Sequence, residues 1–219
     1  GYAGWDNYSR YASCFLSHLI HANSSYLPDI SPVPQIIAVM ILSLAALVVT
    51  VTIKGKGELS IWNVLACIPL GLSPYFLECL SYKFDSPYMA LSILASVLPL
   101  LFYQKRWMWY SLSVVVCMLV MCMTYQAASG IFPMFVVLLT LIWYVRKEDL
   151  KKIGSFILCS AVSYGIGVGI FFLFIMKHVS TYVSNGLADL SGIIAHYKTY
   201  LNYVRTDFRK LCLIVIALV

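Results

Sequence analysis

The chain has 219 residues, of which 61% are apolar and only 11% are charged, and its formal net charge is +6 at pH 7. A soluble domain has about 45–50% apolar and about 25% charged residues, so this composition excludes a soluble protein and predicts an integral membrane protein. The basic residues stand between apolar runs, which indicates membrane topology rather than a nucleic-acid partner.

Residues 1–33 precede the first long apolar run, and we expect them to form an outer loop that contains an amphipathic helix. Between residues 8 and 22, apolar side chains recur at a spacing of three or four, at Tyr11, Phe15, Leu19 and Ala22. This spacing predicts a helix that lies in the plane of the membrane interface, with its apolar face toward the lipid.

Two charged residues in this loop, Asp6 and Arg10, are candidates for chemistry. Asp6 or Asn7 can cap the start of the helix, or Asp6 can act as a base. Arg10 can pair with Asp6 or bind a phosphate through its planar guanidinium. His18 and His21 share a helix face, but no third ligand is evident, so we predict no metal site, and a requirement for a divalent cation stays open.

Six apolar segments then follow that can cross a membrane, since about 20 apolar residues span about 30 Å of hydrocarbon. They are residues 34–53, 61–77, 88–104, 107–123, 131–145 and 153–176. Pro69 and Pro74 are expected to kink the second of them. Gly165 and Gly169, in the sixth, share a helix face and predict close helix packing.

The end of the chain is again apolar. After an outer loop at residues 177–210, a seventh span is expected to begin near Leu211 and to be cut off at residue 219. We therefore expect residues 1–219 to be a single transmembrane domain within a longer protein.

Basic residues alternate between the two sides of this arrangement. The short connections 54–60, 105–106 and 146–152 carry eight Lys and Arg residues, whereas 78–87 and 124–130 carry Lys83 alone. Because short cytoplasmic loops are enriched in Lys and Arg, the first set is predicted to be cytoplasmic. Residues 1–33, 78–87, 124–130 and 177–210 are then predicted to lie on the outer side.

The outer connections hold further polar candidates. Glu78, Lys83 and Asp85 fall within eight residues of one another, beside helix ends that contain proline. Ionisable groups at membrane depth usually serve function, although a solvated turn with a local Lys83–Asp85 pair is an alternative. Tyr125, Gln126 and Ser129, in the next outer turn, could line a site for sugar hydroxyls.

Three stretches resemble the Gtr-type (type II) glucosyltransferases of bacterial surface-polysaccharide and O-antigen modification. They are WDNYSRY with FLSHLIHA (5–11 and 15–22), SPYFLECLSYKFDSPYMALS (73–92) and MTYQAASG (123–130). The resemblance, which covers most of the chain, implies a GT-C-like, all-α transmembrane bundle in the bacterial cytoplasmic membrane. It also implies a polyprenyl-phosphate sugar donor, a polysaccharide acceptor and an active site on the extracytoplasmic side.

The resemblance matches Asp6 and Asp85 to acidic positions of the first and second outer loops. The predicted function is therefore transfer of a glucosyl (hexosyl) residue, with Asp6 as the base, assisted by Asp85. Arg10 and Lys83 would stabilise the leaving phosphate. The remaining donor-binding candidates are Asn7, Glu78 and Gln126. A transporter or lipid-linked-sugar flippase is the alternative, but its charges should lie near the bilayer midplane, whereas these gather at one face.

Overall fold

The computed structural model describes residues 5, 8–21, 28–54, 60–67, 74–103, 105–176 and 189–207. Within these ranges the chain is helical and contains no strand, which confirms the all-α prediction for the described residues. The chain divides into two compact units, residues 1–179 and 180–219, and each is described by itself below.

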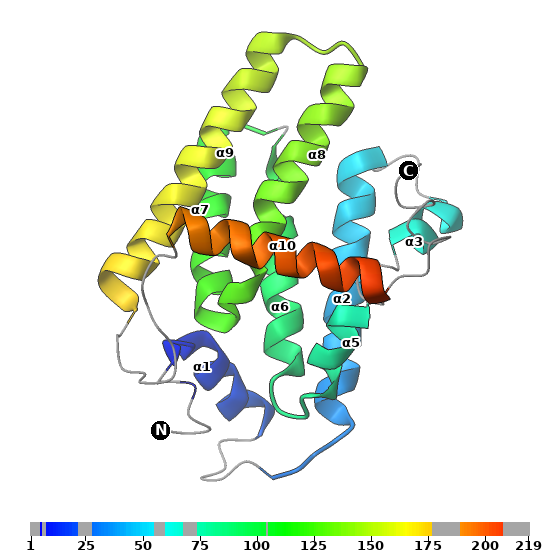
Figure 1. The fold of residues 1–219 in the computed structure, drawn as a ribbon, viewed down its shortest axis with the longest axis vertical. Helices are drawn as coiled ribbons and strands as arrows, with labels where there is room; N and C mark the ends of the chain where they lie inside the picture. Colours follow the sequence, from blue (N-terminus) through cyan, green and yellow to red (C-terminus); the bar gives the residue numbers. More distant parts are fainter. Residues whose placement is uncertain are drawn as a thin grey trace. The chain divides into compact units, whose positions relative to one another are not determined.

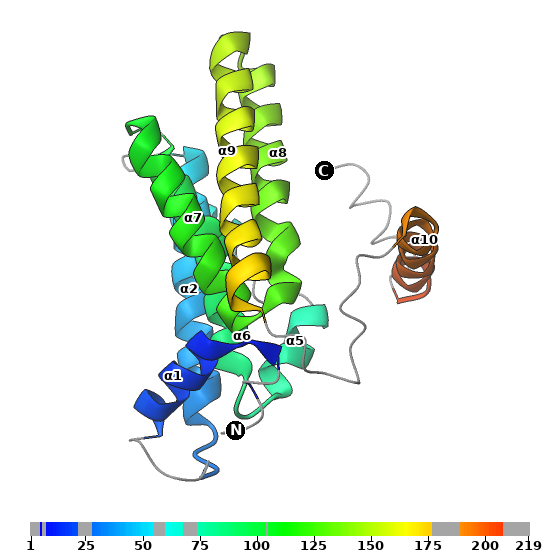
Figure 2. The same cartoon turned by 90° about the vertical axis from the view of Figure 1, so that its left-hand side faces the viewer.

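Four helical segments of the first unit are long and apolar enough to cross a membrane. They are α2 (Val33–Lys54), α7 (Trp107–Thr124), the 3₁₀ turn η3 (Gln126–Gly130) with α8 (Ile131–Val145), and α9 (Leu150–Ile170) with its π-helical extension η4 (Phe171–Ile175). They coincide with the first, fourth, fifth and sixth predicted spans. Figures 1 and 2 show α8 and α9 running side by side along the unit.

The other two predicted spans take different forms. Residues 88–104 correspond to α6 (Ser86–Val97) and η2 (Leu98–Phe102), a shorter apolar helix. Residues 61–77 contain two short helices, α3 (Ile61–Cys67) and the start of α5 (Pro74–Ser81), and the residues between them lie outside the described ranges. The predicted seventh span also lies outside them, so the count of six complete spans stays a prediction.

Helix α6 is the centre of the first unit. It packs against α2 and α7, and α7 packs in turn against α9. Ten residues of α6 are buried, among them Ala90, Ile93 and Val97. These buried residues lie on every face of the helix, as expected for a helix surrounded by other helices. Between α7 and α9, a hydrogen bond of 2.7 Å joins the Tyr110 hydroxyl to Ser160 Oγ.

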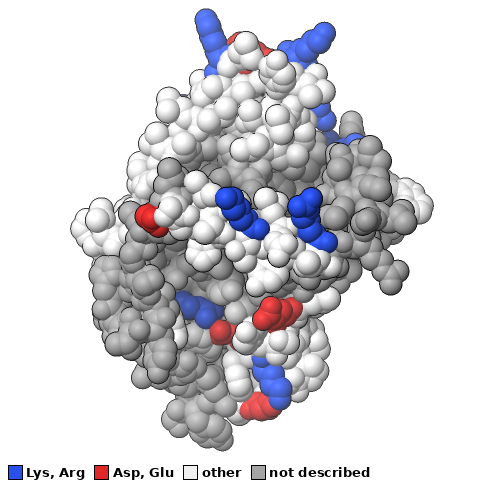
Figure 3. Space-filling view, in the orientation of Figure 1, with Lys and Arg blue, Asp and Glu red and all other residues white. Residues whose placement is uncertain are grey.

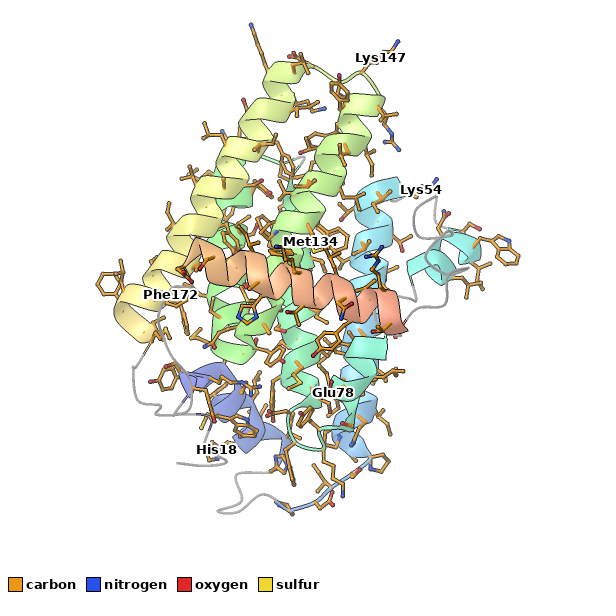
Figure 4. The ribbon with its side chains drawn as sticks, viewed as in Figure 1. His18, Lys54, Glu78, Met134, Lys147 and Phe172 are labelled. Atoms are coloured by element: carbon orange, nitrogen blue, oxygen red, sulfur yellow. The ribbon has the colours of Figure 1, made fainter. Side chains whose placement is uncertain are left out.

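The outward surfaces of the long helices are apolar. Met134 of α8 and Phe172 of η4, both labelled in Figure 4, are 71% and 51% exposed. Leu173 and Phe174 are exposed still further. A soluble protein rarely exposes so large a contiguous apolar surface, so these faces are suited to contact with lipid.

The close approach of α7 and α9 depends on a glycine that the sequence pattern did not single out. A Cβ atom at Gly167 would lie 2.9 Å from Met118 Cβ and 3.0 Å from the Val115 carbonyl oxygen. At Gly165 and Gly169 a Cβ would meet no atom of the described residues within 4 Å. The prediction that Gly165 and Gly169 form the packing face is therefore wrong, because the buried face of α9 passes through Gly167.

The two ends of the first unit differ in charge. In Figure 4, Lys54 and Lys147 lie toward one end, and His18 and Glu78 toward the other. Figure 3 shows basic side chains projecting from the end that the α8–α9 connection forms. The predicted alternation of basic and non-basic connections therefore corresponds to two opposite ends of the described bundle.

The second unit contributes α10 (Leu190–Asp207), which falls in the predicted outer loop 177–210. Asp189 precedes this helix, and its carboxylate accepts hydrogen bonds from the Ser191 hydroxyl and the Gly192 amide. Three tyrosines, Tyr197, Tyr200 and Tyr203, are exposed along it. The helix has the mixed aromatic and basic surface that its sequence indicates.

Candidate functional site

The first predicted outer segment, residues 1–33, contains α1 (Tyr11–Ile20), which packs against α7 through its polar side. Ser13 and Ser17 are fully buried, whereas Phe15 and Leu19 are 68% and 71% exposed. An apolar face directed away from the protein is typical of a helix at a membrane interface. The helix is shorter than predicted, and its N-cap residue is Arg10 rather than Asp6 or Asn7, so the capping prediction is wrong.

Arg10 is the centre of a polar cluster at this end of the unit. Its side chain is only 10% exposed, and its Nη1 donates to Asp85 Oδ2 at 3.0 Å. Its Nε donates to the backbone carbonyl of Thr124 at 2.5 Å, and the guanidinium carbon lies 5.5 Å from the centre of the Tyr125 ring. The buried Nη2 has no hydrogen-bond partner within the described ranges.

Asp85 reaches this cluster from the turn before α6, where it is the N-cap residue but makes no side-chain cap. Its Oδ1 accepts a hydrogen bond of 2.5 Å from the indole nitrogen of Trp5. The Trp5 ring is also packed edge-on against Tyr88 of α6, with ring centres 5.2 Å apart. The carboxylate is therefore held on both oxygens by side chains from the first outer segment.

The C-terminal end of α7 supplies the third part of the cluster. Thr124 is the last residue of α7, and its carbonyl accepts from both Arg10 and Ser13. Carbonyls at a helix C-terminus lack partners within the helix and carry partial negative charge, so a guanidinium there is doubly favoured. Gln126 follows Tyr125 in the chain, and its side-chain amide donates to the backbone carbonyl of Tyr8 at 3.1 Å.

Burial within this cluster shifts the pKa of two side chains, Tyr125 and Cys79. It raises the pKa of the Tyr125 phenol, Cys79 raises it further, and the Arg10 guanidinium opposes both. Burial also raises the pKa of the Cys79 thiol, as does the neighbouring Glu78 carboxylate. Both groups therefore stay protonated near neutral pH and act as neutral neighbours of the Arg10–Asp85 pair.

The cluster unites three of the predicted site residues, which are Arg10, Asp85 and Gln126. Lys83 lies apart, because its Nζ pairs with Asp29 Oδ2 at 2.7 Å on the exposed surface. Since Asp85 pairs with Arg10, the alternative of a local Lys83–Asp85 pair is wrong.

The other candidates are Glu78, Asp6 and Asn7. Glu78 is exposed on α5, and Figure 4 shows it at the same end of the unit as His18. Asp6 and Asn7 lie outside the described residues. His21 Nδ1 contacts the Ser17 carbonyl at 2.9 Å, and no group of three potential metal ligands is present among the residues that are described.

Sequence reasoning missed two partners of the cluster. The Trp5 indole belongs to the quoted stretch WDNYSRY, so its presence there was a signal that could have been used. The Thr124 carbonyl is a backbone group, which no residue type reveals. Trp5 holds Asp85, and Asp85 and the Thr124 carbonyl hold Arg10. The remaining guanidinium nitrogen, which has no partner among the described residues, could donate to an anion.

These features define a polytopic helical membrane protein whose polar, arginine-centred cluster lies at one end of the bundle. The chain belongs to the glucosyl transferase GtrII family, because the model of that family matches residues 1–219.

The chain is also similar to a protein of Salmonella phage P22 described as an uncharacterized 55.3 kDa protein in the gtrB 5′ region. The two are 25% identical over 182 residues, which are 83% of this chain and 37% of the phage protein. The chain thus spans little more than a third of that relative's length. No solved structure matches the chain.

Proposed function

We propose that this chain is the part of a membrane glucosyltransferase that contains the donor-phosphate site. The enzyme would move a glucosyl residue from a polyprenyl-phosphate donor to a polysaccharide acceptor, on the extracytoplasmic side of the bacterial cytoplasmic membrane. The observation that carries the proposal is the buried Arg10 guanidinium, which lies between three predicted outer segments and has one nitrogen without a hydrogen-bond partner among the described residues.

The position of the charges supports transfer over transport. The described parts of α7, η3 and α8, from residue 107 to residue 145, contain no Asp, Glu, Lys or Arg, and in α2 and α9 these residues occur only at the ends. A transporter or flippase needs polar groups near the bilayer midplane. A transferase with a lipid-borne donor needs them where the headgroup lies, at one end of the bundle.

The proposed roles follow from the contacts. Arg10 would donate to the donor phosphate and stabilise the charge that develops as the sugar leaves. Asp85 would position Arg10, since its two oxygens are already occupied by Arg10 and Trp5. A base must take the proton from the acceptor hydroxyl, and we assign this role to Asp6, four residues before Arg10.

The experiment replaces Asp6 with Asn in the full-length protein and measures sugar transfer from a polyprenyl-phosphate glucose donor. Asn keeps the size of the side chain but cannot accept the proton, so transfer should fall by about 10²–10⁴-fold. The matched control is Asp29→Asn, which changes an exposed carboxylate of the same outer segment. It should retain wild-type transfer.

Two results would contradict the assignment. Wild-type turnover in Asp6→Asn with normal thermal stability would move the base elsewhere. Arg10→Lys preserves charge but loses the planar fork, so unchanged transfer with that variant would show that Arg10 does not bind the phosphate through its guanidinium geometry.

A further inference from the structure

A polar cavity lies at the end of the first unit opposite the Arg10 cluster, where two basic connections meet. It has a volume of about 380 Å³ and lies between the α7 start and the α8–α9 connection. Three basic side chains line it, those of Lys105, Arg146 and Lys152. This cavity is separate from the Arg10 cluster, which is built on the opposite ends of the same helices.

The charge of this cavity is unbalanced. Its one lining carboxylate, Glu148, is 3.0 Å from Lys152 Nζ, which leaves Lys105 and Arg146 without an ion-pair partner among the described residues. Lys152 Nζ also lies 5.4 Å from the centre of the Trp143 ring. Two uncompensated cations beside an aromatic wall favour an anionic group with an amphipathic body.

An apolar groove begins at the same lysine. Its volume is about 430 Å³, and it is lined by Lys105 and by side chains that recur every three or four residues along α7, including Trp109, Leu112 and Val116. Lys105 Nζ lies 5.4 Å from the centre of the Phe102 ring, at the same groove. A hydrocarbon chain laid along α7 would therefore have its polar end at Lys105.

We propose that these two cavities together bind one anionic phospholipid. Its phosphate lies between Lys105 and Arg146, and one of its acyl chains occupies the groove along α7. Basic pockets between membrane helices are suited to acidic lipid headgroups, and both cavities fall within the range of about 300–1,000 Å³ typical of ligand sites.

Charge complementarity selects the occupant. A zwitterionic lipid brings a cationic amine together with its phosphate, so it gains less from two unpaired cations than a lipid with net negative charge. The sugar donor is assigned to the Arg10 end of the unit, and Figure 4 shows Lys147 of the α8–α9 connection at the end opposite His18. The lipid site would therefore anchor the protein rather than supply the reaction.

The test measures tryptophan quenching by brominated lipids in the full-length protein reconstituted into vesicles. Trp107 and Trp143 line the polar cavity and Trp109 lines the groove, so a bound brominated lipid quenches them directly. Dibrominated phosphatidylglycerol is compared with dibrominated phosphatidylcholine, and polyprenyl phosphate is added as a competitor. The wild-type protein is expected to prefer phosphatidylglycerol by at least fivefold.

The variants separate a site from general surface charge. In Lys105→Gln with Arg146→Gln, the preference for phosphatidylglycerol should be lost. The matched control, Lys147→Gln with Lys151→Gln, removes the same charge from two exposed positions at the same end of the unit, outside the cavity. This control should keep the wild-type preference. Lys105→Arg with Arg146→Lys should also keep it.

Three outcomes would overturn the proposal. They are an unchanged preference in the Lys105/Arg146 variant, an equal loss in the Lys147/Lys151 control, and displacement of phosphatidylglycerol by polyprenyl phosphate at equal mole fraction. Sugar transfer is not needed for any of these measurements, so the result does not depend on the proposed enzymatic function.

Discussion

The Arg10–Asp85 pair should show a strong energetic coupling, and removing each partner alone should cost a different amount of stability. Removing one partner of a buried pair costs about 3–5 kcal/mol because it leaves a charge without compensation. The Arg10 side chain is 10% exposed and that of Asp85 is 23% exposed. Asp85→Asn leaves the more buried charge, that of Arg10, without its ion-pair partner, so it should cost about 3 kcal/mol of stability. This value is at the lower end of the range because the Thr124 carbonyl still accepts a hydrogen bond from Arg10.

The reverse change should be milder. Arg10→Met leaves a carboxylate that is more exposed and still bonded to Trp5, so we expect a loss of about 1–2 kcal/mol. The double variant removes both charges and should cost about 2 kcal/mol, well below the sum of the single losses. The expected coupling is therefore about 2–3 kcal/mol.

The assay is unfolding of the purified protein in mixed micelles by titration with a denaturing detergent, followed by circular dichroism. A parallel cycle on Lys83 and Asp29, whose side chains are 54% and 51% exposed, should show no measurable coupling. Additive losses for Arg10 and Asp85, or a smaller loss for Asp85→Asn than for Arg10→Met, would refute the reasoning.

Two other predictions concern packing and topology. Gly167→Ala should lower the free energy of unfolding by about 1–3 kcal/mol through overpacking against Met118. The control, Gly165→Ala, should leave the melting temperature unchanged or slightly higher. Equal effects of the two substitutions would argue against the observed α7–α9 contact. In a cysteine-free background, single cysteines at positions 83 and 126 should react with an impermeant reagent in intact cells, and one at position 147 only after permeabilisation. The reversed labelling pattern would place the Arg10 cluster on the cytoplasmic side.

The long helices could be predicted from the sequence because apolar composition alone determines them. The first expected span, residues 34–53, differs from α2 by one residue at each end. The sixth, residues 153–176, begins three residues late because the pattern gave no weight to Asp149, whose side chain accepts from the Lys151 amide at the start of α9. A search for apolar runs does not detect the first turn of a helix when that turn contains charged residues.

The partners within the site could not be predicted, because they are far apart in the chain. Arg10 and Asp85 are separated by 75 residues, and Lys83 and Asp29 by 54. Sequence proximity suggested Asp85 for Lys83, but the structure pairs Asp85 with Arg10 and Lys83 with Asp29. The suggested pairing of Asp6 with Arg10 stays a prediction, because Asp6 lies outside the described residues. What could be predicted was the meeting of the three outer segments, since the alternation of basic loops already placed them on one side.

If Arg10 binds the donor phosphate as proposed, the outward apolar face of α1 has a consequence for where that reaction would take place. Arg10 directly precedes α1, so the depth at which Phe15 and Leu19 settle in the lipid would set the depth of the guanidinium. A thinner or thicker bilayer would then shift the reacting plane relative to the long helices without any change in the protein. The lipid surroundings would act as a specificity determinant, because only donors whose phosphate lies at that depth could reach Arg10.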